Sequence, residues 1–152
     1  MPRWLPIAII IGLFIGLAAW YANVTPYRTP GRLIHQRGNV PDVGAPDERQ
    51  HANYISHLLQ NHSFPILKPG SPDLIETYQS HQPPLYYVIA STMGEPTKAT
   101  RYLNILFGAL TLFALYRLGR LVSKSEAVGL ACASFGLLPG FIMLNAAITN
   151  DA

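Results

Sequence analysis

Long uncharged stretches constrain this chain more than any other feature of its sequence. The first runs over 4–27, and at about 1.5 Å per residue its apolar part is long enough as a helix to cross a hydrocarbon layer of roughly 30 Å. A second covers 102–116 and a third covers 127–150. The second spans only if the flanking Arg101 and Arg117 extend toward the lipid headgroups. These stretches predict an all-α membrane protein.

The three predicted transmembrane helices divide the chain into short ends, one tight turn and one long loop. Loops longer than about 60 residues follow the positive-inside bias poorly, so the basic residues near the short turn decide the orientation. Arg3, Arg117, Arg120 and Lys124 crowd into the two short segments on one side. We therefore expect an extracytoplasmic long loop. The expected parts are helices at 1–24, 101–122 and 126–149, the long loop at 25–100, and the start of another outer loop at 150–152.

The first stretch has a second interpretation, as a cleaved signal peptide, because Arg3 supplies a positive charge ahead of it. Its apolar run exceeds a usual signal-peptide core, however. Cleavage after Ala22 would also place the bulky Trp20 at the −3 position. These features favour a retained helix.

Composition excludes several other classes of function. The formal net charge of +3 is too small and too scattered to indicate nucleic-acid binding. The sequence contains no Lys/Arg-rich run, no Walker loop and no paired CxxC motif. Its single cysteine, Cys132, lies in the third stretch, so an intrachain disulfide is impossible.

Acidic residues and a histidine gather at one point of the long loop, in the sequence APDERQH at 45–51. A helix over DERQHANYISHLLQN places Asp47 on one stripe with Tyr54, Ile55 and Leu58. Acids in a first helical turn stabilise the helix dipole and need no further purpose. The functional interpretation is that the surface that buries this stripe also buries the Asp47 carboxylate, which then needs a cation or a proton.

A divalent metal is an alternative explanation of the same residues. His51 is four residues from Asp47 and three from Glu48, so these side chains meet on one helix face. The HExxH order is absent and His81 is only a distant third ligand. A histidine that hydrogen-bonds the acid is the favoured interpretation, and the cofactor stays unassigned.

The segment HQPPLYY at 81–87 is a stiff, proline-rich entry into a helix, or a rigid backbone that holds His81 and Gln82 at the membrane surface. We expect the helix after it to lie along the membrane interface, where Tyr86 and Tyr87 are favoured.

The third stretch ends in LLPGFIMLNAAITND. Pro139–Gly140 predicts a kink within it. Asn150 and Asp151 make its end polar and emerge on the same side as Asp47. This is an ordinary helix terminus entering water, or part of a site shared with the long loop.

In this order, PDERQH, HQPPLYY and LLPGFIMLNAAITND resemble the N-terminal part of GT-C membrane glycosyltransferases. These polyprenyl-phosphate-sugar-dependent enzymes include protein O-mannosyltransferases and lipid A aminoarabinose transferases. The resemblance covers essentially the whole chain. It implies a longer multi-span protein of a bacterial or archaeal plasma membrane, of which this chain is the N-terminal part. Its partners would be membrane lipid and a polyprenyl-phosphate-linked sugar donor, whose sugar moves to a hydroxyl acceptor on the extracytoplasmic face.

The resemblance also implies roles for individual residues. Asp47 would be the general base that deprotonates the acceptor, with inversion at the anomeric carbon, and Glu48 would orient the acceptor or the base. Aminoarabinose-type enzymes have a lysine before the diproline, where this chain has Gln82, so only a contact role is carried over for that motif. The residues expected to contact substrate are Arg49, His51, His81, Gln82, Arg101, Asn150 and Asp151, with Arg49 or Arg101 neutralising the lipid phosphate.

Two other functions compete with this one. The first is a small non-enzymatic membrane protein whose outer loop binds a partner. The second is a metal-dependent membrane hydrolase that uses Asp47, Glu48 and His51.

Overall fold

The computed structural model describes residues 4–25, 27, 45 and 47–151, which form helices and contain no strand among them. The prediction of an all-α chain is confirmed for this part of the sequence. Two helices are long and apolar enough to cross a membrane. They are α1 (Leu5–Val24) and the helix made of η2 (Lys98–Thr100) continuing into α5 (Arg101–Ser123).

The third apolar segment is bent by 65°. It consists of α6 (Glu126–Ser134), η3 (Phe135–Leu137) and α7 (Pro139–Asn145), and it passes as one more membrane-crossing segment only if the bent pair is counted as one. The kink predicted at Pro139–Gly140 is confirmed. Proline has no N–H and disfavours helical backbone at the residue before it, and Leu138 accordingly has extended backbone.

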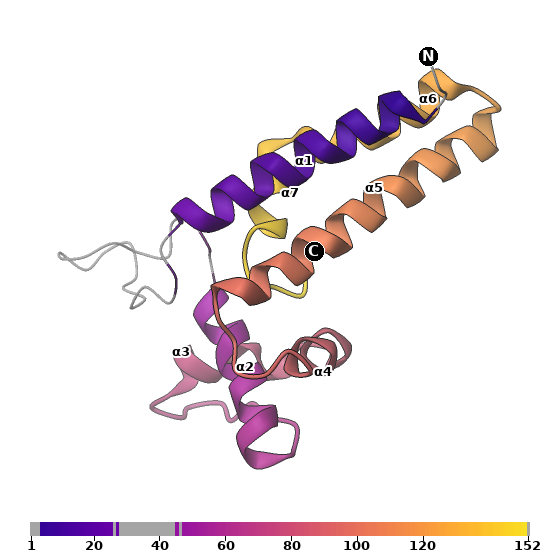
Figure 1. The fold of residues 1–152 in the computed structure, drawn as a ribbon. Helices are drawn as coiled ribbons and strands as arrows, with labels where there is room; N and C mark the ends of the chain where they lie inside the picture. Colours follow the sequence, from indigo (N-terminus) through magenta and orange to yellow (C-terminus); the bar gives the residue numbers. More distant parts are fainter. Residues whose placement is uncertain (1–3, 26, 28–44, 46, 152) are drawn as a thin grey trace.

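These segments form a helical bundle in which α1 contacts α5, α6 and α7 (Figure 1). Its core contains Phe14, Ala18 and Ala22 of α1 packed against Ile105 and Leu112 of α5. Large apolar side chains on the opposite faces are exposed, as expected for helices that contact lipid. These exposed residues include Leu13, Leu17, Trp20, Leu106, Leu110 and Phe113.

Glycines let α5 and α6 approach closely. A Cβ atom on Gly129 would lie 2.9 Å from the Tyr116 carbonyl oxygen and 2.5 Å from Cγ of Arg120. A Cβ atom on Gly119 would lie 3.1 Å from the Cα atom of Gly129. Lipid is as apolar as the helices, so it gives them no hydrophobic reason to associate. Apolar helices in lipid therefore usually pack closely through small residues.

A second layer lies at the end of the bundle where α1 ends and α5 begins (Figure 1). Its core is a stack of Tyr54 on Tyr87, with ring centroids 3.8 Å apart, surrounded by Ile55, Ala90 and Ile148. Ile148 comes from the segment after α7, so the two layers share this cluster. The layer's helices are α2 (Glu48–Asn61), α3 (Leu74–Thr77), η1 (Tyr78–His81) and α4 (Leu85–Ser91).

The helix predicted after the diproline is present as α4, but the expected position of its tyrosines is wrong. Tyr87 is fully buried, and Tyr86 is turned toward Asn104 and the Thr149 backbone. Packing against other aromatic and polar groups inside the layer gives the tyrosine rings and hydroxyls contacts that a lipid surface does not offer.

We expect Gly129→Ala to lower the melting temperature of the detergent-solubilised protein. The new methyl group collides with a backbone carbonyl, and overpacking of this kind destabilises by about 1–3 kcal/mol. Gly16→Ala is the matched control, because a Cβ atom there meets nothing within 4 Å. Equal melting temperatures for the two variants would contradict the close α5–α6 contact.

Candidate functional site

A buried ion pair joins the two layers. Nε of Arg101 donates to Oε1 of Glu48 at 2.6 Å, and Nη2 donates to Oε2 at 2.5 Å. The same guanidinium donates to the carbonyl oxygens of Ala22 and Thr25, at the end of α1. Arg101 is 0% exposed and Glu48 is 2% exposed. The expectation that Arg101 extends toward the headgroups is therefore wrong, because a bidentate carboxylate and two carbonyls satisfy it inside the protein.

The segment after α7 is held at the same place by backbone contacts. The Ile148 N–H donates to Oε1 of Glu48 at 3.0 Å. Nδ2 of Asn104, one turn after Arg101, donates to the carbonyl oxygens of Ala147 and Thr149 at 2.7 and 2.8 Å. Glu48 and Asn104 thus satisfy polar backbone that would otherwise be buried without partners.

Asp47 lies beside this pair but outside the core. Helix α2 begins at Glu48, and Asp47 precedes it with a left-handed backbone, φ 59°. Its side chain is exposed. The expected burial of Asp47 with Tyr54 and Ile55 is therefore wrong, since the turn at Asp47 removes it from the helical stripe and makes Glu48 the first buried residue. An aspartate accepts this conformation more easily than most residues, and such positions are frequent at functional sites.

His51 is buried on the inner face of α2 and hydrogen-bonds Tyr87. Its Nδ1 lies 2.7 Å from the Tyr87 hydroxyl, and the two rings are nearly parallel. Burial lowers the pKa of His51 to about 4, and the negative charge of Asp151 acts in the opposite direction. Burial also raises the pKa of the Tyr87 phenol. At neutral pH this pair is uncharged, so it packs α2 against α4.

The HQPP segment meets the polar end of the third apolar segment. Nδ2 of Asn150 donates to Oε1 of Gln82 at 3.0 Å, while the Asn150 Oδ1 is buried with no hydrogen-bond donor among the described residues. Asp151 is exposed and close enough to influence the charge state of His51. His81 is exposed, and its Nδ1 lies 2.6 Å from the Tyr78 carbonyl oxygen.

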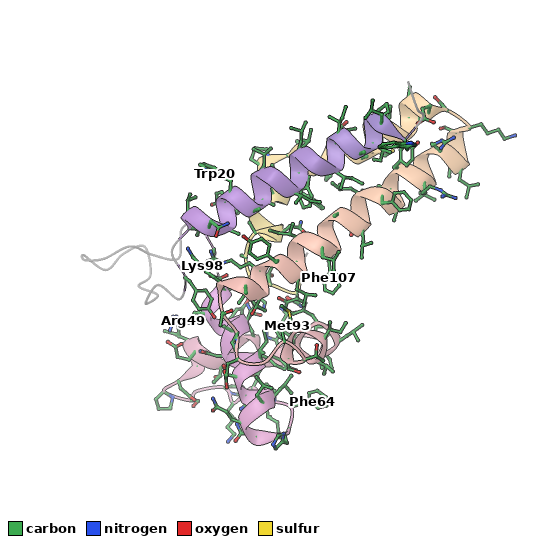
Figure 2. The ribbon with its side chains drawn as sticks, in the orientation of Figure 1. Trp20, Arg49, Phe64, Met93, Lys98 and Phe107 are labelled. Carbon is green, nitrogen blue, oxygen red and sulfur yellow. The ribbon has the colours of Figure 1, made fainter. Side chains whose placement is uncertain are left out.

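Arg49 faces away from the buried pair. Its guanidinium bonds the carboxylate of Glu76 on α3, which also accepts from Asn53 at 3.1 Å. Arg49 therefore joins α2 to α3 within the second layer, near the end of α2 that adjoins the bundle (Figure 2).

The described residues contain no group of three or more His, Cys, Asp or Glu side chains arranged to hold a metal ion. Within the expected metal set, Glu48 is bonded to Arg101 and His51 to Tyr87. The arrangement therefore gives no ligand set for the hydrolase alternative.

Sequence reasoning missed Asn104 and Tyr87. Asn104 follows Arg101 by three residues, so both lie on one helix face, and an amide inside an apolar span is itself a signal of a polar contact. Tyr87 offered no such signal, because an aromatic residue in a short apolar run fits a lipid interface equally well.

No protein family, no curated protein and no solved structure matches the chain. The site is therefore interpreted from its own geometry.

We expect Glu48→Ala to destabilise the protein by about 3–5 kcal/mol, because it leaves the Arg101 guanidinium buried without its carboxylate. Urea unfolding in detergent measures the effect, and the double change Glu48→Met with Arg101→Met should recover a large part of it. Glu126→Ala is the control: the Arg120–Glu126 pair is about 40% exposed on both sides, and such pairs contribute about 0–1 kcal/mol. Similar losses of unfolding free energy in the Glu48→Ala and Glu126→Ala proteins would contradict a larger contribution from the buried pair.

We expect the unfolding free energy to fall as the pH decreases from 6.5 to about 4, because unfolded His51 takes up a proton that the folded protein resists. The effect is on the order of 3 kcal/mol and levels off below the lowered pKa. His51→Gln keeps a hydrogen-bonding side chain without the titration. The difference in unfolding free energy between the two proteins separates the titration of His51 from that of the carboxylates. A difference that does not change between pH 6.5 and about 4 would refute the lowered pKa of His51.

Proposed function

We propose that this chain is part of an integral membrane glycosyltransferase that moves a sugar from a polyprenyl-phosphate donor to a hydroxyl acceptor on the extracytoplasmic face. One observation carries the proposal. Three polar motifs far apart in the sequence meet at one end of an apolar bundle, through the Glu48–Ile148 and Gln82–Asn150 contacts. Asp47 and Asp151 belong to these motifs and are exposed, so a substrate in solution can reach them.

The apolar helices support the membrane part of the proposal. α1, α5 and the bent α6–α7 pair have the length and composition of membrane-crossing segments. Their basic turn is cytoplasmic in the proposal, and the α2–α4 layer is extracytoplasmic. A donor held in the bilayer by its lipid tail presents its phosphate at headgroup depth, so the catalyst needs its base on a layer that lies against the membrane.

Asp47 is the proposed general base. Its carboxylate removes the proton of the acceptor hydroxyl as the oxygen attacks the anomeric carbon. The bond from that carbon to the phosphate oxygen breaks, and the lipid phosphate leaves with the electron pair, so the configuration inverts. Glu48 is then a positioning residue: both of its oxygens are occupied by Arg101 and the Ile148 N–H, and they fix the start of α2 beside Asp47.

The polar end of the third segment supports an acceptor site. The buried Asn150 oxygen accepts a hydrogen bond from the incoming hydroxyl in this proposal, and Gln82 holds the Asn150 amide in place. Asp151 and His81 line the exposed side. His51 is a buried packing residue in the same scheme and does not touch substrate.

Arg49 is the proposed cation for the departing phosphate. Arg101 is fully engaged within the protein, which leaves Arg49 of the two candidates. The Arg49 side chain is 14% exposed and its partner Glu76 is 43% exposed, so the phosphate would approach from the Glu76 side and take the place of that carboxylate.

A second function, partner binding without catalysis, is favoured by one observation. An open hollow of about 360 Å³ lies on the outer layer, away from the motifs, and combines the cation of Lys68 with the carboxylate of Asp73 and the apolar Phe64 and Ile66. Phe64 lies near the end of α2 that is remote from the bundle (Figure 2). Such a mixed surface suits a peptide segment of another protein.

We expect Asp47→Asn to reduce sugar transfer from the polyprenyl-phosphate donor at least 10²-fold, since a general base contributes about 10²–10⁴-fold. Membrane abundance should not change, because the side chain is exposed. Asp73→Asn is the matched control, an exposed acid next to α3 that should leave transfer intact. Unchanged transfer by the Asp47→Asn protein would remove the base assignment, and equal loss of transfer in the Asp73→Asn protein would show that the effect is not specific to Asp47.

A further inference from the structure

Helix α4 carries an exposed aliphatic stripe. Leu85 is 72% exposed, Val88 43%, Ile89 38%, and Met93, just beyond the helix, 50%. The spacing of i, i+3, i+4 and i+8 puts these side chains on one face of a helix. The opposite face, with Tyr87 and Ala90, is fully buried. The outward face of α4 is thus the apolar one.

The chemistry of this stripe suits lipid better than protein. No Asp, Glu, Lys or Arg occurs between Glu76 and Glu95. Protein interfaces are enriched in Tyr, Trp and Arg anchors within a polar rim, but both tyrosines of α4 are directed inward. A face of flexible aliphatic side chains with uncharged flanks needs only an apolar medium.

The buried face of α4, opposite the stripe, packs against the first turns of α5. Leu103, in the first turn of α5, packs on the cluster that contains Tyr87 and Ala90. Tyr86 is turned toward Asn104 of the same turn. α4 therefore lies beside the N-terminal turns of α5, where exposed Tyr102 and Leu106 begin the lipid-facing surface of that helix (Figure 1). A bilayer that surrounds α5 reaches α4 at its boundary.

We propose that α4 is an in-plane membrane anchor, with Leu85, Val88, Ile89 and Met93 inserted at the boundary between headgroups and acyl chains. The inference rests on the proposed function, which places the chain in a membrane. It adds the element that sets the depth of the candidate site relative to the bilayer. Gln82 lies three residues before Leu85 and bonds Asn150. An anchored α4 therefore holds the Gln82–Asn150 contact at the depth of a lipid phosphate.

Position-specific quenching tests the anchor. The full chain carrying Cys132→Ser and Val88→Cys is labelled with an environment-sensitive fluorophore and placed in phosphatidylcholine–phosphatidylglycerol vesicles. We expect nitroxide-labelled acyl chains to quench the label at position 88 about twofold or more strongly than one at Ile75→Cys, and aqueous iodide to show the reverse order. Ile75 is the matched control because it is 59% exposed on α3, on the side of α2 away from α4 (Figure 1).

Two results would overturn the anchor. Strong iodide quenching at position 88 with no nitroxide effect means that α4 faces water. Protection from both quenchers means that another protein segment covers it. Trp20 fluorescence in a Trp4→Phe protein tests separately whether the chain enters the membrane. Brominated lipids quench the exposed Trp20 whenever α1 is inserted. Quenched Trp20 with an iodide-accessible position 88 removes the anchor alone, and unquenched Trp20 removes both. Sugar transfer is scored separately.

Discussion

The buried Arg101–Glu48 pair is the constraint on which the rest of the structure depends. Removing two charges from water is unfavourable by several kcal/mol per ion, and the attraction between them compensates only when the remaining donors and acceptors are also satisfied. Here that requirement recruits Ala22 and Thr25 at the end of α1 and the Ile148 N–H after α7. The ion pair therefore connects four segments that are distant in the sequence: α1, α2, α5 and the segment after α7.

The same ion pair explains why two adjacent acids differ in burial. Glu48 must enter the helix and turn inward to meet Arg101, so the residue before it turns the chain in the opposite sense, and Asp47 adopts left-handed backbone. The consequence is an exposed carboxylate directly before a buried one. A side chain held by its neighbour's buried contacts loses less freedom when it meets a substrate than one on a flexible loop.

Much of the fold could be predicted because apolar length and proline position are local properties. α1, α5 and the bend at Pro139 follow from them directly. The site was harder to predict, because periodicity assigns residues to a helix face only once the first residue of the helix is known. When the helix begins one residue later than expected, Glu48 is the buried acid in place of Asp47. The inward turn of Arg101 depends on a carboxylate 53 positions away in the chain. Flanking arginines and interfacial tyrosines have two favourable environments, lipid headgroups or buried partners, and only the tertiary contacts decide between them.

The concentration of acids and a histidine in an apolar chain now has a physical reason. Hydrophobic contacts hold part of the junction between the two layers, through the cluster of Tyr54, Tyr87 and Ile148, and polar contacts hold the rest. Glu48, Asn104 and the Gln82–Asn150 pair make polar contacts where the layers meet, whereas His51 packs α2 against α4 within the second layer. Asp47 is the exposed acid of the motif, and its side chain caps no backbone group of α2. Its position beside these polar contacts is set by the turn that directs Glu48 inward.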